Sequence, residues 1–175
     1  FLLRGMPFID LAHLRKRDMQ DGRITYSRHK TDKPITVRIP REALVLIAKY
    51  ADRHSASSYL FPILDARIRD SWQSYRNYQD ALRHFNRKLG QVMSRLLPGV
   101  RVSSYTARHT WATLAFHSGQ PVGIISQALG HSSLRVTETY LKPFGNELVD
   151  KANRQLIASV RKCKWKNETG YRAGL

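Results

Sequence analysis

The amino-acid sequence predicts a mainly α-helical domain with one small antiparallel β-sheet, an α+β fold. Apolar residues recur at three- and four-residue spacing over most of the chain, which is the period of amphipathic helices. Only residues 23–28 and 35–39 alternate apolar and polar side chains as strands do. The 175 residues, 42% of them apolar, are enough for one hydrophobic core and too few for two domains of ordinary size.

The first part of the chain predicts a helix, a hairpin and a second helix. A short helix is expected over residues 7–16, because Pro7 has a fixed φ that suits the first helical turn. Asp21 and Gly22 mark a turn before the strand of residues 23–28. Residues 29–34 are polar and form the hairpin loop. Pro40 ends the second strand, and an amphipathic helix follows over residues 41–51.

The second part predicts five helices. The longest is expected over residues 70–97, where apolar residues form one stripe and Pro98-Gly99 ends the helix. A second stripe of four arginines beside it is either a solvated face or a flank lying along a nucleic-acid duplex: Arg69, Arg76, Arg83 and Arg87. Helices are also expected over residues 103–117, 121–130, 133–140 and 146–160. The basic segment after residue 160 lacks periodicity and is expected to be frayed or docked elsewhere.

Charge is the strongest signal in the composition. Thirty basic residues, twenty of them arginine, against thirteen acidic ones give a formal net charge of +17. Arginine binds phosphate with a planar fork of donors, so a polyanion such as nucleic acid is the expected partner. Composition alone does not separate DNA from RNA, nor a binding module from an enzyme.

Other features exclude several classes of protein. The single cysteine, Cys163, excludes an intramolecular disulfide and a zinc site built on cysteine pairs. No run of 18 apolar residues is present, so no membrane-spanning helix is expected. The chain begins without methionine and is expected to be the middle of a longer protein, with an N-terminal part missing.

Two interpretations compete for residues 120–140. Two short helices around a glycine turn in a basic chain are compatible with a DNA-binding helix-turn-helix. The other interpretation is a catalytic set formed by Lys30, Arg108, His131 and Tyr140. Each of these residues also has an ordinary structural explanation, such as an exposed lysine or a half-buried helix tyrosine.

Together these residues resemble a known family. The segments A-R-H-T-W-A-T-L-A (107–115), A-L-G-H-S-S (128–133) and T-E-T-Y (137–140) are similar to the tyrosine recombinase, or phage integrase, family. The resemblance, which runs from Gly5 to about Asp150, implies a second arginine at Arg108 and an L-G-H histidine at His131. It also implies a tyrosine nucleophile at Tyr140. Lys30 matches the family's hairpin lysine.

Two positions depart from the family pattern. Tyr105 stands where the family's H-x-x-R box begins with histidine; a phenol hydrogen-bonds well but is a poor base near neutral pH. Pro7 stands where the first arginine is expected, with Asp10 at the position of its acidic partner. Arg4 is the first candidate to supply the missing guanidinium, and Arg15 or Arg28 is the next. Openings of this kind resemble integrases of conjugative and other mobile elements.

The resemblance implies DNA cleavage without a metal or cofactor. The sequence offers neither paired carboxylates for two metal ions nor a phosphate-binding P-loop. Tyr140 would attack a backbone phosphorus and form a covalent 3′-phosphotyrosine. Arg108 and Arg4 would stabilise the charge on the non-bridging oxygens, and Lys30 would protonate the leaving 5′ oxygen. His131 would hydrogen-bond the phosphate or accept the tyrosine proton; His109 is interpreted as structural.

The expected organisation is a recombinase catalytic domain over residues 1–160 and a basic tail over residues 161–175. The family's N-terminal DNA-binding domain would lie outside this chain. Double-stranded DNA is the expected partner, contacted by four basic residues: Arg28, Lys33, Arg135 and Lys142. The chain is expected in the cytoplasm with the nucleoid, as a monomer when free and a homotetramer on DNA, with residues 157–175 packed on a neighbour.

Two alternatives to a recombinase remain open at this point. One is a DNA-binding regulator on the same fold that no longer cleaves, because the first arginine is displaced. The other is an unrelated basic RNA-binding module.

Overall fold

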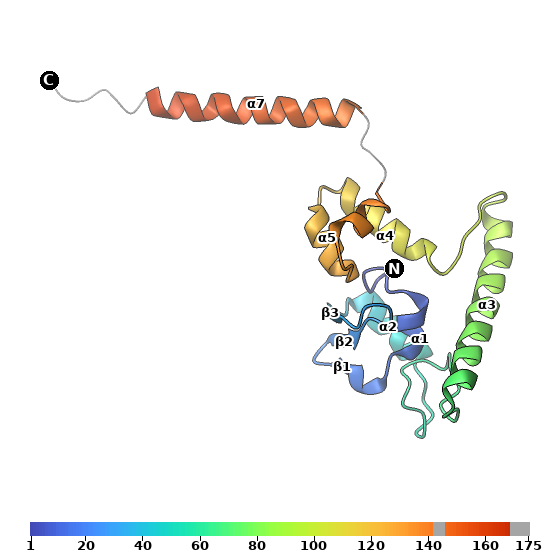
Figure 1. Cartoon of the computed structure of the whole chain (residues 1–175). Helices are drawn as coiled ribbons and strands as arrows, with labels where there is room; N and C mark the ends of the chain where they lie inside the picture. The colour runs from blue at the N-terminus through green and yellow to red at the C-terminus, as the bar shows by residue number, and fades with distance from the viewer. Residues whose placement is uncertain (142–145, 169–175) are drawn as a thin grey trace. The chain divides into compact units, whose positions relative to one another are not determined.

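A computed structural model describes residues 1–141 and 146–168, with side chains up to residue 159. The expected fold class is confirmed: helices surround a three-stranded antiparallel sheet of order β1-β2-β3 (Figure 1). Residues 1–141 form one compact unit, and the helix after residue 145 belongs to a second. The two units are described separately.

The N-terminal part of the first unit contains the sheet and two helices. Its elements are α1 (Phe8–His13), the 3-10 helix η1 (Lys16–Asp18), β1 (Met19–Gln20), β2 (Arg23–Ser27), β3 (Pro34–Arg38) and α2 (Arg41–Tyr50). The helix expected over residues 7–16 is shorter and ends at His13, and the separate 3-10 helix begins at Lys16. The strand β1 is absent from the sequence prediction, because two residues are too few to show alternation.

The sheet buries one face against α2. Ile24 lies opposite Val37 across the hairpin, and both side chains are almost fully buried. They pack in one core cluster with Ala43 and Ile47 of α2, which lie on the buried stripe of that helix. The alternation of β2 and β3 thus places apolar side chains on the buried face of the sheet and leaves the other face exposed, as the sequence predicts.

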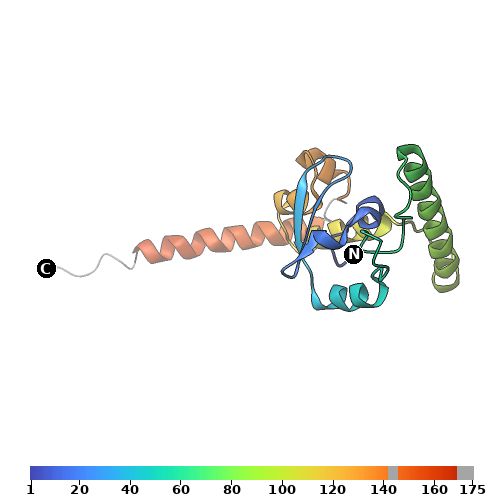
Figure 2. The same cartoon turned by 90° about the horizontal axis from the view of Figure 1, so that it is seen from below.

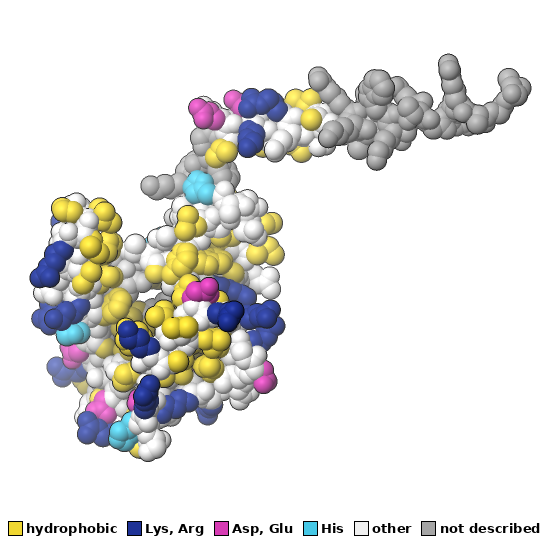
Figure 3. All heavy atoms as spheres, turned by 180° about the vertical axis from the view of Figure 1, so that it is seen from behind, with side chains coloured by type: hydrophobic (Ala, Val, Ile, Leu, Met, Phe, Trp, Pro, Cys, Tyr) yellow, Lys and Arg dark blue, Asp and Glu magenta, His cyan; other side chains and the backbone are white. Residues whose placement is uncertain are grey.

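The long helix α3 (Ser71–Leu96) begins at Asp70, whose carboxylate accepts the backbone N–H of Gln73 at 2.8 Å. Its apolar stripe is only partly covered: Tyr78 and Leu82 pack on the cluster around Phe8, whereas other members of the stripe stay exposed, namely Tyr75, Val92 and Leu96. An open apolar groove of about 1000 Å³ therefore lies between α3 and the helices α1 and α2 (Figure 3).

The third part of the first unit consists of α4 (Thr106–His117), α5 (Val122–Leu129) and α6 (Leu134–Glu138). Ala112, Ile125 and Leu129 form its fully buried core. The tip of the β2–β3 hairpin reaches this helical group (Figure 2), and Arg28 is hydrogen-bonded to it. The sequence predicts α6 to extend to residue 140, but the helix ends at Glu138 and a tight turn leads to Tyr140.

The second unit is the helix α7 (Asn146–Glu168). It extends beyond the expected end at residue 160, so the backbone is helical over part of the segment for which no regular structure is predicted. Four apolar side chains on it are exposed: Leu148, Val149, Leu156 and Ile157. Among the residues that the structure describes, no helix is long and apolar enough to cross a membrane.

Candidate active site

The L-G-H motif lies at the C-terminal end of α5. Leu129 is the last residue of α5 and its side chain is fully buried, and Gly130 turns the chain with a φ of 64°. A Cβ at Gly130 would overlap Ile35 and lie 2.9 Å from Cδ of Arg28, so this position requires glycine for both space and conformation. Because carbonyls at a helix C-terminus lack intrahelical partners, the Leu129 oxygen is available to other donors.

Two buried arginines donate to this one oxygen. The Nη2 of Arg108 lies 2.6 Å from the Leu129 oxygen, and the Nη1 of Arg28 lies 2.7 Å from it. The Nη1 of Arg108 also donates to the carbonyl of Gly5 at 3.1 Å. The two residues are 2% and 5% exposed, so the protein fixes both guanidinium groups next to each other away from bulk water.

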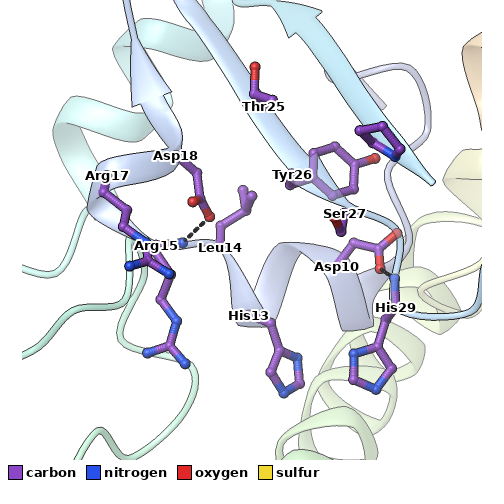
Figure 4. A pocket seen from close by; sticks show the side chains of 11 residues that line it. Asp10, His13, Leu14, Arg15, Arg17, Asp18, Thr25, Tyr26, Ser27 and His29 are labelled. Carbon is purple, nitrogen blue, oxygen red and sulfur yellow. Dashed lines mark hydrogen bonds between the residues drawn. The ribbon is translucent and has the colours of Figure 1, made fainter. Parts of the chain in front are cut away.

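Asp10 holds the second of these arginines in place. Its Oδ2 lies 3.3 Å from Nε of Arg28, and its Oδ1 accepts the backbone N–H of His29 at 2.9 Å. Burial raises the pKa of Asp10, while the His29 N–H and the Arg28 charge oppose that rise. Asp10 also lines a polar cavity of about 390 Å³ beside the stacked rings of His13 and His29 (Figure 4).

The charges of the arginine pair are not balanced locally. Two guanidinium groups face one carboxylate, that of Asp10, and burial followed by the Arg28 charge lowers the pKa of Arg108. A buried cation without a counter-charge is unfavourable, so an anion that both groups could bind would be strongly favoured. A phosphodiester has two non-bridging oxygens and suits two such donor forks.

His131 connects the arginine pair to the nucleophile segment. Its Nε2 lies 3.0 Å from Nη2 of Arg108, and its Nδ1 lies 2.8 Å from Oγ1 of Thr137. Burial, followed by the charges of Arg108, Arg28 and Lys30, lowers the pKa of His131 to about 4. Since arginine only donates, Nε2 accepts and Nδ1 carries the hydrogen that it donates to Thr137. The ring is thus neutral and its acceptor nitrogen is engaged.

Tyr140 presents its hydroxyl next to that of Tyr105. The two hydroxyls are hydrogen-bonded, which places the tyrosine of the Y-T-A-R box directly against the predicted nucleophile. Burial and the bond to Tyr105 raise the pKa of Tyr140, and the charge of Arg108 acts in the opposite direction. The rings of His109 and His131 lie 4.5 Å and 5.1 Å from the ring of Tyr140.

The loop between β2 and β3 brings Lys30 and Lys33 close to His131. Lys33 donates its Nζ to the His131 carbonyl at 3.2 Å, which ties the loop to the L-G-H segment. Lys30 is exposed and close enough for its charge to depress the pKa of His131. Within residues 1–141 and 146–168, Lys30 has no hydrogen-bond or ion-pair partner, which leaves its ammonium available.

The other predicted residues lie outside this arrangement. Arg4 is half-buried at a φ of 55° and makes no hydrogen bond or ion pair with any residue described. Arg15 is engaged elsewhere, bonded to Ser58 and 4.0 Å above the ring of Tyr59. Arg135 is exposed on α6.

Two residues expected to contact DNA do not lie on the described surface, and two side-chain contacts of the site were not predicted from the sequence. Lys142 lies outside the described residues, and Arg28, expected as a DNA contact, is 5% exposed and donates to the Leu129 oxygen beside Arg108. The sequence did not predict the hydrogen bond that His131 donates to Thr137, nor the contact between the rings of His109 and Tyr140. The T-x-x-Y spacing around Thr137 was the available signal for the first; nothing in the pattern indicated the second.

Comparison with known proteins agrees with this geometry. The model of the phage integrase family matches residues 3–147. The chain is 29% identical over 140 residues to the tyrosine recombinase XerA of Thermococcus kodakarensis, covering 79% of this chain and 46% of that protein. XerA of Pyrococcus furiosus is 28% identical over 153 residues, covering 86% and 50%. The chain thus spans about half the length of these relatives.

Solved structures show the same fold. A crystal structure of XerA recombinase superposes with a TM-score of 0.60 at 21% identity, covering 88% of this chain and 54% of that one. The Tn1549 transposon integrase in complex with a circular intermediate DNA gives a TM-score of 0.61 at 15% identity, covering 88% and 55%. With its family model matched over residues 3–147 and its motifs gathered in one site, the chain belongs to the phage integrase family.

Proposed function

We propose that this chain is the catalytic part of a site-specific recombinase that cleaves and rejoins double-stranded DNA through a covalent 3′-phosphotyrosine. The observation that carries the proposal is the pair of buried guanidinium groups on the Leu129 oxygen, of which that of Arg108 interacts with the bonded hydroxyls of Tyr140 and Tyr105. The names of the relatives, tyrosine recombinases and a transposon integrase, support the same activity.

The strand-cleavage step follows from these positions. The oxygen of Tyr140 forms a bond to phosphorus while the bond from phosphorus to the 5′ oxygen breaks. Tyr140 passes its proton to water through the hydroxyl of Tyr105, to which it is bonded, and Lys30 supplies a proton to the departing 5′ oxygen. Charge that develops on the non-bridging oxygens is met by Arg108 and its neighbouring guanidinium. Rejoining reverses the step, because the phosphotyrosine keeps the energy of the original ester.

Arg28, rather than Arg4, is the residue that we assign to the family's first arginine. It shares the Leu129 oxygen with Arg108 and is paired with Asp10, the acidic residue expected beside that arginine. The guanidinium that Pro7 lacks is thus supplied from the hairpin, two residues before Lys30. Arg28 is far from Pro7 in sequence, but it pairs with Asp10, which lies three residues after Pro7.

His131 acts on the reaction through Arg108. Its neutral ring accepts from Arg108 and donates to Thr137, so it holds the guanidinium in place and links it to the turn that carries Tyr140. This role replaces the expectation that His131 accepts the tyrosine proton, since its acceptor nitrogen is already used.

A nicked suicide substrate tests the activity. The short strand released after cleavage diffuses away, so covalent protein–DNA accumulates and is visible as a shifted band in denaturing gels. Covalent DNA that disappears in Tyr140→Phe supports the enzyme. Binding without covalent product supports the non-cleaving regulator, and preference for RNA supports the RNA-binding module.

The finer features of assembly are also proposals. We expect a homotetramer on two DNA sites, with Lys33, Arg135 and Lys142 on the DNA side and α7 packing on a neighbouring copy. The exposed apolar side chains of α7 support this role. The boundary between catalytic domain and tail at residue 160, and a location with DNA in the cytoplasm, belong to the same proposal. Leu156→Glu should reduce the tetramer that sedimentation detects on DNA.

A further inference from the structure

The ring of His109 lies against the ring of Tyr140. Their centroids are 4.5 Å apart with an interplanar angle of 30°. The same imidazole meets Tyr105 edge-on, at 5.1 Å and 73°. Tyr105 is the N-cap residue of α4 and His109 lies one turn later, its N–H bonded to the Tyr105 carbonyl, so the two side chains lie on one face. Together they form a surface on which the nucleophile rests, with Tyr105 contacting the hydroxyl and His109 the ring.

The backbone alone does little to orient Tyr140. Helix α6 has already ended at Glu138, and the Tyr140 N–H bonds to the carbonyl of Thr137, which closes one tight turn. A side chain at the end of such a turn can adopt several rotamers. Its direction in the protein is therefore set by its side-chain neighbours, of which His109 is the nearest ring.

We propose that His109 is a positioning residue that fixes the nucleophile: its imidazole face holds the ring of Tyr140 so that the hydroxyl stays against Tyr105, facing the arginine pair. This inference rests on the proposed function and adds to it a residue that the sequence alone assigns to the structural background. The ring of His109 has no hydrogen bond among the described residues, so the contact with the Tyr140 ring is through its face.

The size of the effect follows from the strength of aromatic contacts. Offset ring pairs favour one arrangement by enough to change a population by about three- to tenfold. Losing the contact should reduce the fraction of molecules with Tyr140 in the reactive position by that factor. DNA affinity should stay unchanged, because a positioning contact acts on the rate of cleavage and not on the phosphate contacts that hold the duplex.

The experiment compares His109→Ala, His109→Phe and the control His117→Ala on the nicked substrate. His117 lies two turns further along the same helix, with its ring against Phe116. His109→Ala should lower the rate of covalent complex formation at saturating DNA about three- to tenfold, whereas His109→Phe, which keeps a flat ring, should restore it. Wild-type rates in His109→Ala, or an equal defect in His109→Phe, overturn the proposal.

A second measurement does not depend on cleavage. With 3-fluorotyrosine incorporated, the resonance of residue 140 is identified by its loss in Tyr140→Phe. His109→Ala should move this ¹⁹F signal toward that of free fluorotyrosine, and His109→Phe should not. An unmoved signal overturns the positioning role, whatever the activity. Absence of covalent DNA with a signal that moves as expected overturns the proposed function: His109 then orients the Tyr140 ring, but that ring is not a nucleophile.

Discussion

The arginine pair and the hairpin loop differ sharply in how the protein holds them. Arg108 and Arg28 are buried, and each makes at least two contacts with fixed groups. Lys30, in contrast, lies exposed on the loop that joins β2 to β3. The groups that stabilise charge are preorganised, because reorganising them during the reaction would lose the benefit. Under the proposed function the general acid, Lys30, is held by no partner among the described residues, and bound DNA would set its position.

Lys30 offers the largest expected effect. As general acid it should contribute about 10²–10⁴-fold to cleavage, so Lys30→Ala should slow cleavage of ordinary DNA by that factor. A 5′-bridging sulfur leaves without a proton, and cleavage rates on that substrate should be nearly equal for wild type and variant. Equal defects on both substrates would mean that the loop lysine only positions DNA.

Substitution of Arg28 tests the role of the buried arginine pair. Arg28→Lys should slow cleavage about 10²–10³-fold, as for loss of one preorganised donor, whereas Arg4→Ala should cleave at close to the wild-type rate. Lysine keeps a charge near Asp10 and limits unfolding, which thermal melts would check. A methylphosphonate at the scissile position removes the negative charge and should partly rescue the variant. A large defect in Arg4→Ala with a small one in Arg28→Lys would reverse the assignment.

A smaller effect is expected on the salt dependence of DNA affinity, to which exposed basic residues should contribute. Log affinity for DNA should fall linearly with log salt, since each neutralised phosphate releases counterions. Exposed residues should contribute to this slope, so Arg135→Ala should reduce it by about one. Arg38→Ala, at an exposed position of β3, provides a matched charge control. An affinity that does not respond to salt would contradict a DNA-binding surface.

The smallest expected effect is on the pH dependence of stability. It tests His131, which connects the arginine pair to the hairpin loop. The pKa of His131 is about 4 in the folded protein against 6.5 ordinarily, so the unfolded chain takes up the proton first as pH falls. Stability due to the neutral ring is therefore full above pH 6.5 and is lost as pH falls toward 4. Melting temperatures measured across this range should fall less steeply in His131→Gln. An unchanged slope would mean that His131 is not held neutral.

The sequence by itself determined the elements whose signals are local. The alternation of β2 and β3, the stripe of α3 and the glycine that ends α5 each follow from neighbours within a few residues. The motif residues Arg108, His131 and Tyr140 were also identified from sequence, and the structure brings them together. The two-residue strand β1 gave no such signal, because its pairing is made by a partner strand and not by its own pattern.

Only the tertiary structure shows which arginine pairs with Asp10 and shares the Leu129 oxygen with Arg108. Along the chain Arg4 is nearest to the position that Pro7 occupies, and nothing local favours Arg28. In the folded protein Asp10 and the Leu129 oxygen select Arg28, through contacts that span 18 and 101 residues of sequence. Burial likewise lowers the pKa of His131, and the packing of distant segments brings the ring of His109 to that of Tyr140. These properties depend on the field and packing of distant segments, which no local pattern records.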